Sequence, residues 1–77
     1  MRNPVIDQTV RPIFYQNVKR LCHEQNMNLG VVEEDSGLNK GRLSQRKYRI
    51  LLEHAVAIAK QLGVTVDYLV TEHKEET

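Results

Sequence analysis

The sequence of 77 residues contains no tryptophan, one phenylalanine, one cysteine and two prolines. The single cysteine, Cys22, excludes an internal disulfide, and its apolar position in a helical pattern is typical of a small core residue. Because aromatic side chains are scarce, aliphatic residues must form most of the core. A chain of this length can form one domain with one small core.

Long apolar stretches are also missing. No stretch approaches the length of a membrane span, and the first residues, MRNPVIDQTVRP, lack the apolar run of a signal peptide. The apolar content of 40% is nevertheless enough to bury a core, so the composition is not that of a disordered chain. We therefore expect a folded cytoplasmic protein without a membrane partner.

Residues with catalytic or metal-binding chemistry do not occur in useful arrangements. His23, His54 and His73 do not share metal-ligand spacing with a carboxylate or thiol, so no metal site and no cofactor are predicted. The consecutive acids at 33–35 point in different directions on a helix, which favours a solvated acidic face over paired catalytic carboxylates. Ser44 has no neighbouring His and acid to activate it, and no enzyme activity is expected.

The charge is unevenly distributed, although the net charge is only +1. One ten-residue window holds five basic residues and no acid: Lys40, Arg42, Arg46, Lys47 and Arg49. Acidic residues lie just before this window and at the end of the chain. A docking surface responds to charge within roughly 10 Å at moderate salt, so the window is a candidate contact surface for an anionic partner. A purely solvated charged face is the alternative interpretation.

Turn and capping residues divide the chain into an arm, five helices and a tail. Residues 1–11 form the expected N-terminal arm, because prolines bracket it and its polar residues are poor helix formers. The apolar spacing then predicts a first helix that starts at Pro12 and ends near Asn26. Asn28 is a strong N-cap for a second helix, which Gly37 ends.

The last two helices carry the strongest apolar pattern. The spacing predicts a helix over 51–62 that ends at Gly63, followed by a short helix capped by Thr65. Residues 72–77 form an acidic tail. No strand alternation of useful length is present, so we predict an all-α protein with one domain at 12–71.

The segment between the second and fourth helices predicts a helix-turn-helix. A short helix, a tight turn at Gly37 and a third helix over about 39–47 brace one another in such a unit. Asn39 is the expected cap of the third helix, and Leu43 is its one apolar anchor. For DNA reading, the opposite face of this helix must present long polar side chains.

The side chains of the third helix include suitable donors. Arg can pair bidentately with guanine and Gln with adenine, whereas Lys and Arg also neutralise phosphates. The candidates for base-edge contacts are Lys40, Arg42, Gln45 and Arg46. The candidates for phosphate contacts are Asn39, Ser44, Lys47 and Arg49. Arg2 and Arg11 of the arm are expected to reach the neighbouring backbone or minor groove.

Four stretches of the chain carry a resemblance to a known family. They are VKRLCHEQNMN, the turn SGLN, the pair LS at 43–44, and LLEHAVAIAKQLGVTVDYLV, which is the most specific of the four. From Asn17 to Val70 they are similar to the first helix, the turn, the recognition helix and the last two helices of the Cro and C repressor family of phages, also called the xenobiotic-response-element type.

The resemblance implies a compact five-helix lambda-repressor-like helix-turn-helix domain. It further implies a sequence-specific transcriptional regulator, with a phage, prophage or mobile-element repressor as the setting. The third helix would read the major groove of double-stranded DNA. A domain this small makes few contacts, so we expect a homodimer on an inverted repeat with half-sites one helical turn apart.

The chain departs from the family pattern mainly around the second helix. Leu29 stands where the family has Gln, Glu33 where it has a small residue that contacts the third helix, and Gly41 lies inside the expected recognition helix. With Val31 and Val32, Leu29 makes the second helix more apolar than usual. This supports an alternative function, a protein-interaction module of the same fold, such as an antitoxin or an antagonist of another regulator. Exposure of both Leu29 and Val31 would favour a protein partner.

Overall fold

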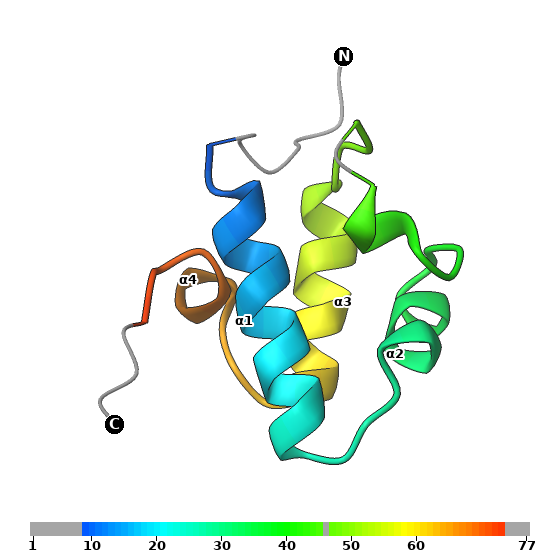
Figure 1. Cartoon of the computed structure of the whole chain (residues 1–77), viewed down its shortest axis with the longest axis horizontal. Helices are drawn as coiled ribbons and strands as arrows, with labels where there is room; N and C mark the ends of the chain where they lie inside the picture. The colour runs from blue at the N-terminus through cyan, green and yellow to red at the C-terminus, as the bar shows by residue number, and fades with distance from the viewer. Residues whose placement is uncertain (1–8, 46, 74–77) are drawn as a thin grey trace.

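The computed structural model describes residues 9–45 and 47–73, and this part of the chain contains helices and no strand. The elements follow in the order α1 (Arg11–Glu24), α2 (Leu29–Asp35), the 3-10 helix η1 (Arg42–Ser44), α3 (Leu52–Leu62) and α4 (Val66–Leu69). In Figure 1, α1 and α3 run side by side in the centre, with α4 flanking α1 on the left and α2 beside α3 on the right. The predicted all-α class is confirmed.

Parts of the sequence-based prediction fall outside the described residues. These are Arg2 with most of the expected arm, Arg46, and residues 74–77 of the expected tail. Within the described part, no helix has the length and apolar character needed to cross a membrane.

The first two helices begin and end close to the positions that the sequence indicates. Pro12 lies in the first turn of α1, where its missing N–H removes no helical hydrogen bond. Asn26 follows α1 in the left-handed conformation, with φ +57°. Asn28 caps α2, because its side chain accepts a hydrogen bond of 3.2 Å from the Val31 amide.

Helices α3 and α4 also follow the prediction. Gly63 ends α3 with φ +74°, a conformation that suits glycine, which has no Cβ. The hydroxyl of Thr65 accepts a hydrogen bond of 3.1 Å from the Tyr68 amide and so caps α4. The acid of the first turn, Asp67, complements the positive end of the helix dipole.

The core lies between α1, α3 and α4 and extends under α2 and η1. Its fully buried side chains are mainly aliphatic, as the composition requires, and include Phe14, Val18, Val32, Leu43, Ile50, Ile58 and Leu69. Cys22 belongs to the same cluster, which confirms its reading as a core residue. Burial raises the pKa of the Cys22 thiol, and the nearby Glu33 carboxylate raises it further.

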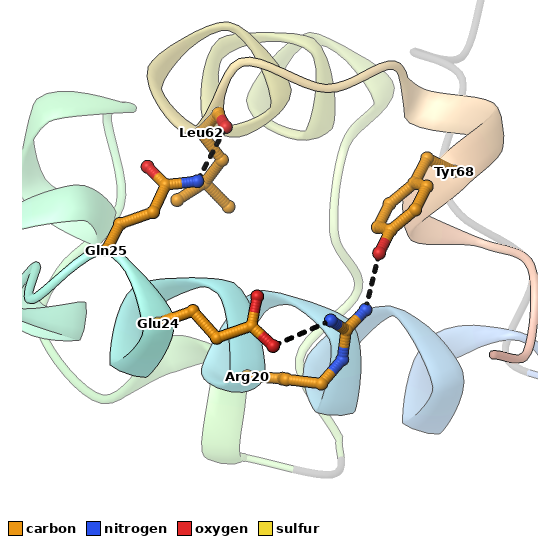
Figure 2. Close-up of polar contacts among 5 residues, drawn as sticks. All are labelled: Arg20, Glu24, Gln25, Leu62 and Tyr68. Atoms are coloured by element: carbon orange, nitrogen blue, oxygen red, sulfur yellow. Dashed lines mark hydrogen bonds and ion pairs between the residues drawn. The ribbon is translucent and has the colours of Figure 1, made fainter. Parts of the chain in front are cut away.

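The C-terminal half of α1 is tied to both of the last helices (Figure 2). The Arg20 guanidinium donates to the Tyr68 hydroxyl at 2.6 Å and pairs with Glu24 at 3.2 Å. The Gln25 side chain donates to the carbonyl of Leu62, the last residue of α3, at 2.9 Å. The hydrogen bond to Tyr68 is the main reason that the pKa of Arg20 lies above its usual value.

The predicted third helix over 39–47 is wrong. The described part of the chain has four α-helices, and only Arg42–Ser44 of the predicted segment is helical, as a 3-10 turn. Gly41 adopts φ +86°, which a residue inside an α-helix cannot do. The backbone carbonyl of Asn39 accepts a hydrogen bond of 3.2 Å from the Arg42 amide. Asn39 therefore does not cap a long helix, as the prediction required.

Candidate nucleic-acid interface

Residues 40–49 are called the basic segment from here on. Its described residues, 40–45 and 47–49, lie around η1 between α2 and α3 (Figure 1). Leu43 is fully buried and anchors the segment in the core, as predicted. Lys40, Lys47 and Arg49 are exposed, and Arg42 is half-buried. The described cations of the segment therefore lie toward the outside, while its one aliphatic residue faces inward.

Glu33 holds the segment from α2. Its side chain is only 2% exposed. One carboxylate oxygen accepts a hydrogen bond from the Gly41 amide at 3.0 Å, and the other accepts one from the Leu43 amide at 2.9 Å. Bonds to an ionised carboxylate are stronger than neutral ones, and they satisfy amides at the start of η1 that have no partner inside so short a helix.

The assignment of Glu33 to a solvated acidic face is therefore wrong. Its neighbours Glu34 and Asp35 are exposed, as that interpretation required, but Glu33 points inward. The signal in the sequence is that Glu33 stands where the repressor family that the sequence resembles has a small residue. A carboxylate at that position needs donors, and the backbone of the basic segment supplies them.

Arg11 holds the segment from α1. The residue is 6% exposed and lies in the first turn of the helix. Its Nε donates to the Tyr48 carbonyl at 2.8 Å, and its Nη2 donates to the Leu43 carbonyl at 2.9 Å. The same guanidinium nitrogen also contacts the carbonyls of Arg42 and Gln45. The expectation that Arg11 reaches DNA from a free arm is wrong, because its donors are buried against this backbone.

The two buried charges act on opposite ends of the same short turn. The Glu33 carboxylate meets amides at the start of η1, and the Arg11 guanidinium meets carbonyls at its end. Each charge thus meets backbone groups of the opposite partial charge. A buried charge is tolerated when its hydrogen bonds are made, and here the backbone of one segment makes them for both residues.

Two of the side chains expected at base edges, Arg42 and Gln45, lie close to each other. The Arg42 guanidinium lies 5.2 Å from the centroid of the Tyr48 ring and donates to the Gln45 side chain at 3.3 Å. A cation over an aromatic face is held in one direction without being neutralised. Gln45 is exposed, so both side chains stand on the outer surface of the segment.

Lys40 lies over α2. Its ammonium is 3.9 Å from the carboxylate of Glu34, and both side chains are more than half exposed. A Cβ added to Gly30 would lie 3.2 Å from the Lys40 side chain, so this glycine leaves room for the lysine stem. Exposed pairs of this kind contribute little, and the ammonium can exchange Glu34 for another anion.

The remaining phosphate candidates surround the turn. Asn39, Ser44, Lys47 and Arg49 are all exposed. The Ser44 hydroxyl donates to the Gly41 carbonyl at 2.8 Å, which leaves its oxygen able to accept but not to donate.

The apolar residues of α2 differ in exposure. Val31 is 48% exposed, Val32 is buried, and Leu29 is half-buried against the core. The condition that would favour a protein partner, exposure of both Leu29 and Val31, is met by Val31 alone.

Other polar features lie away from the basic segment or carry no ligand chemistry. A hollow of about 340 Å³ is lined by Pro12, Ile13, Gln16, Asn17, Glu72 and His73. His73 stacks on the Tyr68 ring with centroids 3.9 Å apart, and His54 is half-buried beside Gly37. Among the described residues, no three His, Cys, Asp or Glu side chains gather as a metal site would require.

Comparisons with protein-family models, with curated proteins and with solved structures found no match for this chain.

Proposed function

We propose that the protein binds double-stranded DNA through the basic segment and acts as a sequence-specific transcriptional regulator. The observation that supports the proposal is that the backbone of this segment is anchored inside the protein while its charged side chains lie outside. Its backbone is held from the inside by Glu33 and Arg11, while its described cations lie toward the outer surface, with Lys40 beside the exposed carboxylate of Glu34. Such a surface suits a polyanion whose charges are regularly spaced.

The exposed side chains divide into two roles. Lys47 and Arg49, with Asn39, contact phosphates and set affinity and salt dependence. Ser44 is left out of these contacts, because its hydroxyl proton is donated to the Gly41 carbonyl. Arg42, Gln45 and Lys40, with Arg46 from outside the described residues, reach base edges in the major groove. Because η1 is only three residues long, readout comes from one turn of the backbone and its side chains and not from successive turns of a recognition helix.

The sequence resemblance supports the regulator setting and the lambda-repressor-like helix-turn-helix arrangement. In this arrangement α2 braces the basic segment, which takes the place of the recognition helix. One domain makes few contacts with DNA, so we propose that two copies bind an inverted repeat with half-sites one helical turn apart.

A binding selection of the purified protein against random duplex DNA at physiological salt tests the proposal. An enriched inverted repeat is the expected result, and its spacing gives the geometry of the dimer. Weak, salt-sensitive retention without enrichment would contradict sequence-specific regulation.

The second candidate is a protein-interaction module, for which Val31 is exposed while Leu29 is half-buried. Val31→Ser provides the discriminating variant. It leaves DNA selection unchanged if the basic segment is the interface, and it abolishes capture of a protein partner in a pull-down if α2 is the interface.

A further inference from the structure

Two buried, oppositely charged side chains converge on one exposed segment of this small protein. Glu33 comes from α2 and Arg11 from α1, 22 positions apart in the chain, and both bond to the backbone of the basic segment. Burying charges is a costly way to stabilise a fold, since well-packed apolar residues often do as well. Such an arrangement is best explained by the conformation that it specifies.

The conformation in question is one that the segment does not favour by itself. In an α-helix, the carbonyls of Arg42 and Leu43 would accept from amides four residues further along the chain. Arg11 donates to these same carbonyls, so it competes directly with an extension of η1. Glu33 fixes the other end, and Gly41 supplies the left-handed residue that the turn needs.

We propose that Glu33 and Arg11 are positioning residues for DNA binding. They act through the backbone of the basic segment, hold it in the short turn, and thereby set its affinity for duplex DNA without contacting DNA themselves. This inference rests on the proposed function, because it assumes that the basic segment is the DNA-binding surface. A segment that is ordered before binding loses less conformational entropy when it binds, so its affinity is higher.

Arg11→Lys separates this role from a simple charge effect. Lysine keeps the positive charge, but a single ammonium cannot reproduce the planar set of donors that spans several carbonyls. If Arg11 contributes charge to DNA binding, the variant keeps its affinity. If it positions the segment, affinity falls. Glu33→Gln is the partner variant, because it preserves the shape of the side chain but replaces one acceptor with a donor that faces an amide.

Asn17→Ala is the matched control. Asn17 lies on α1 like Arg11, is buried, and donates to the carbonyls of Tyr68, Leu69 and Thr71 at the end of α4. Removing its side chain therefore destabilises a different part of the same protein. The control measures what a general loss of stability does to DNA binding.

The experiment measures the dissociation constant and its salt dependence by fluorescence anisotropy, on the duplex enriched in the selection. Arg11→Lys and Glu33→Gln are expected to weaken binding by about tenfold or more. Asn17→Ala is expected to stay within about twofold of the wild type, since distant sites act independently. Unchanged affinity in both positioning variants, or an equal loss in Asn17→Ala, would overturn the proposal.

Amide hydrogen exchange tests whether Glu33 holds the turn, independently of whether the protein binds DNA. The Gly41 and Leu43 amides are expected to exchange faster in Glu33→Gln than in the wild type, with or without DNA. If the wild type binds no duplex, the proposed function fails, and unaccelerated exchange would separately show that Glu33 does not hold the turn. Should either buried variant not fold, Gly41→Ala strains the same turn from the outside. It too must weaken binding, and an unchanged dissociation constant would overturn the proposal.

Discussion

Two regions of the molecule each receive hydrogen bonds from a side chain of α1: the region of α3 and α4, and the basic segment. Different forces determine their structures. Asn17 binds the carbonyls at the end of α4, and Arg11 binds the carbonyls at the end of η1. In the first region the local sequence already dictates the helices, through the apolar spacing, Gly63 and Thr65. In the second, the local sequence is compatible with a helix, and residues far along the chain decide against it.

The difference between the two regions shows which elements a small apolar core can position and which it cannot. Apolar packing positions α3 and α4, because each presents a buried face to α1. Leu43 is the one aliphatic side chain that the basic segment buries, so the path of the segment depends on hydrogen bonds. Charged residues in the interior supply these bonds, which leaves the outer surface to the cations.

The largest effect is expected from removing the carboxylate of Glu33. Glu33→Ala leaves the buried Leu43 amide and the part-buried Gly41 amide without their acceptor, and we expect a loss of about 3 kcal/mol in the free energy of unfolding. Chemical denaturation checks this. The exposed neighbour gives the control, since Glu34→Ala should change stability by less than about 0.5 kcal/mol. Equal effects would show that Glu33 is not buried in solution.

The corresponding change in the region of α3 and α4 is Asn17→Ala. We expect it to lower the free energy of unfolding by about 2 kcal/mol. Its consequence should be local to α4, because its hydrogen bonds go to Tyr68, Leu69 and Thr71. Amide exchange should accelerate in α4 and not at Leu43. Acceleration at Leu43 would mean that the two regions open together and that the comparison between them does not hold.

The same substitution, glycine to alanine, can be made in both regions. Gly41 and Gly63 both have positive φ, and a Cβ at either would meet nothing within 4 Å. Substitution by alanine should therefore cost about 1–2 kcal/mol at each, from backbone strain alone. Thermal unfolding measures this cost. Only Gly41→Ala should also weaken DNA binding, and a similar weakening in Gly63→Ala would argue against the basic segment as the interface.

Capping of α4 gives a smaller effect. Thr65→Ala removes the hydroxyl that accepts from the Tyr68 amide, at a cost of about 1 kcal/mol. Thr65→Ser keeps the hydroxyl and should recover most of the loss in a denaturation series. Failure of serine to do so would show that packing of the threonine methyl group, and not capping, stabilises this helix.

The smallest effect on stability is expected for Lys47→Ala, because the side chain is exposed. The free energy of unfolding should change by less than about 0.5 kcal/mol. DNA binding should weaken uniformly on all sequences, and the slope of log affinity against log salt should flatten by about 0.9. An unchanged slope would remove Lys47 from the interface.

Sequence reasoning succeeded where structure follows from neighbours along the chain. The caps Asn28 and Thr65, the end of the first helix near Asn26 and the anchoring role of Leu43 were all predicted and confirmed. It failed for Arg11, whose partner carbonyl at Arg42 lies 31 positions away, and for Glu33, whose partner amides lie 8 and 10 positions away in the next segment. Base-edge and phosphate roles stay predictions, since exposure shows that a side chain is available and not what it binds.

The most direct test is a titration of the isotopically labelled protein with the selected duplex, followed by the amide resonances. The account predicts that the largest shifts fall in the basic segment and at the adjoining end of α2, while α3 beyond its first turn and α4 stay unchanged. Shifts centred on α4, or on the exposed side of α2 around Val31 without the basic segment, would contradict it.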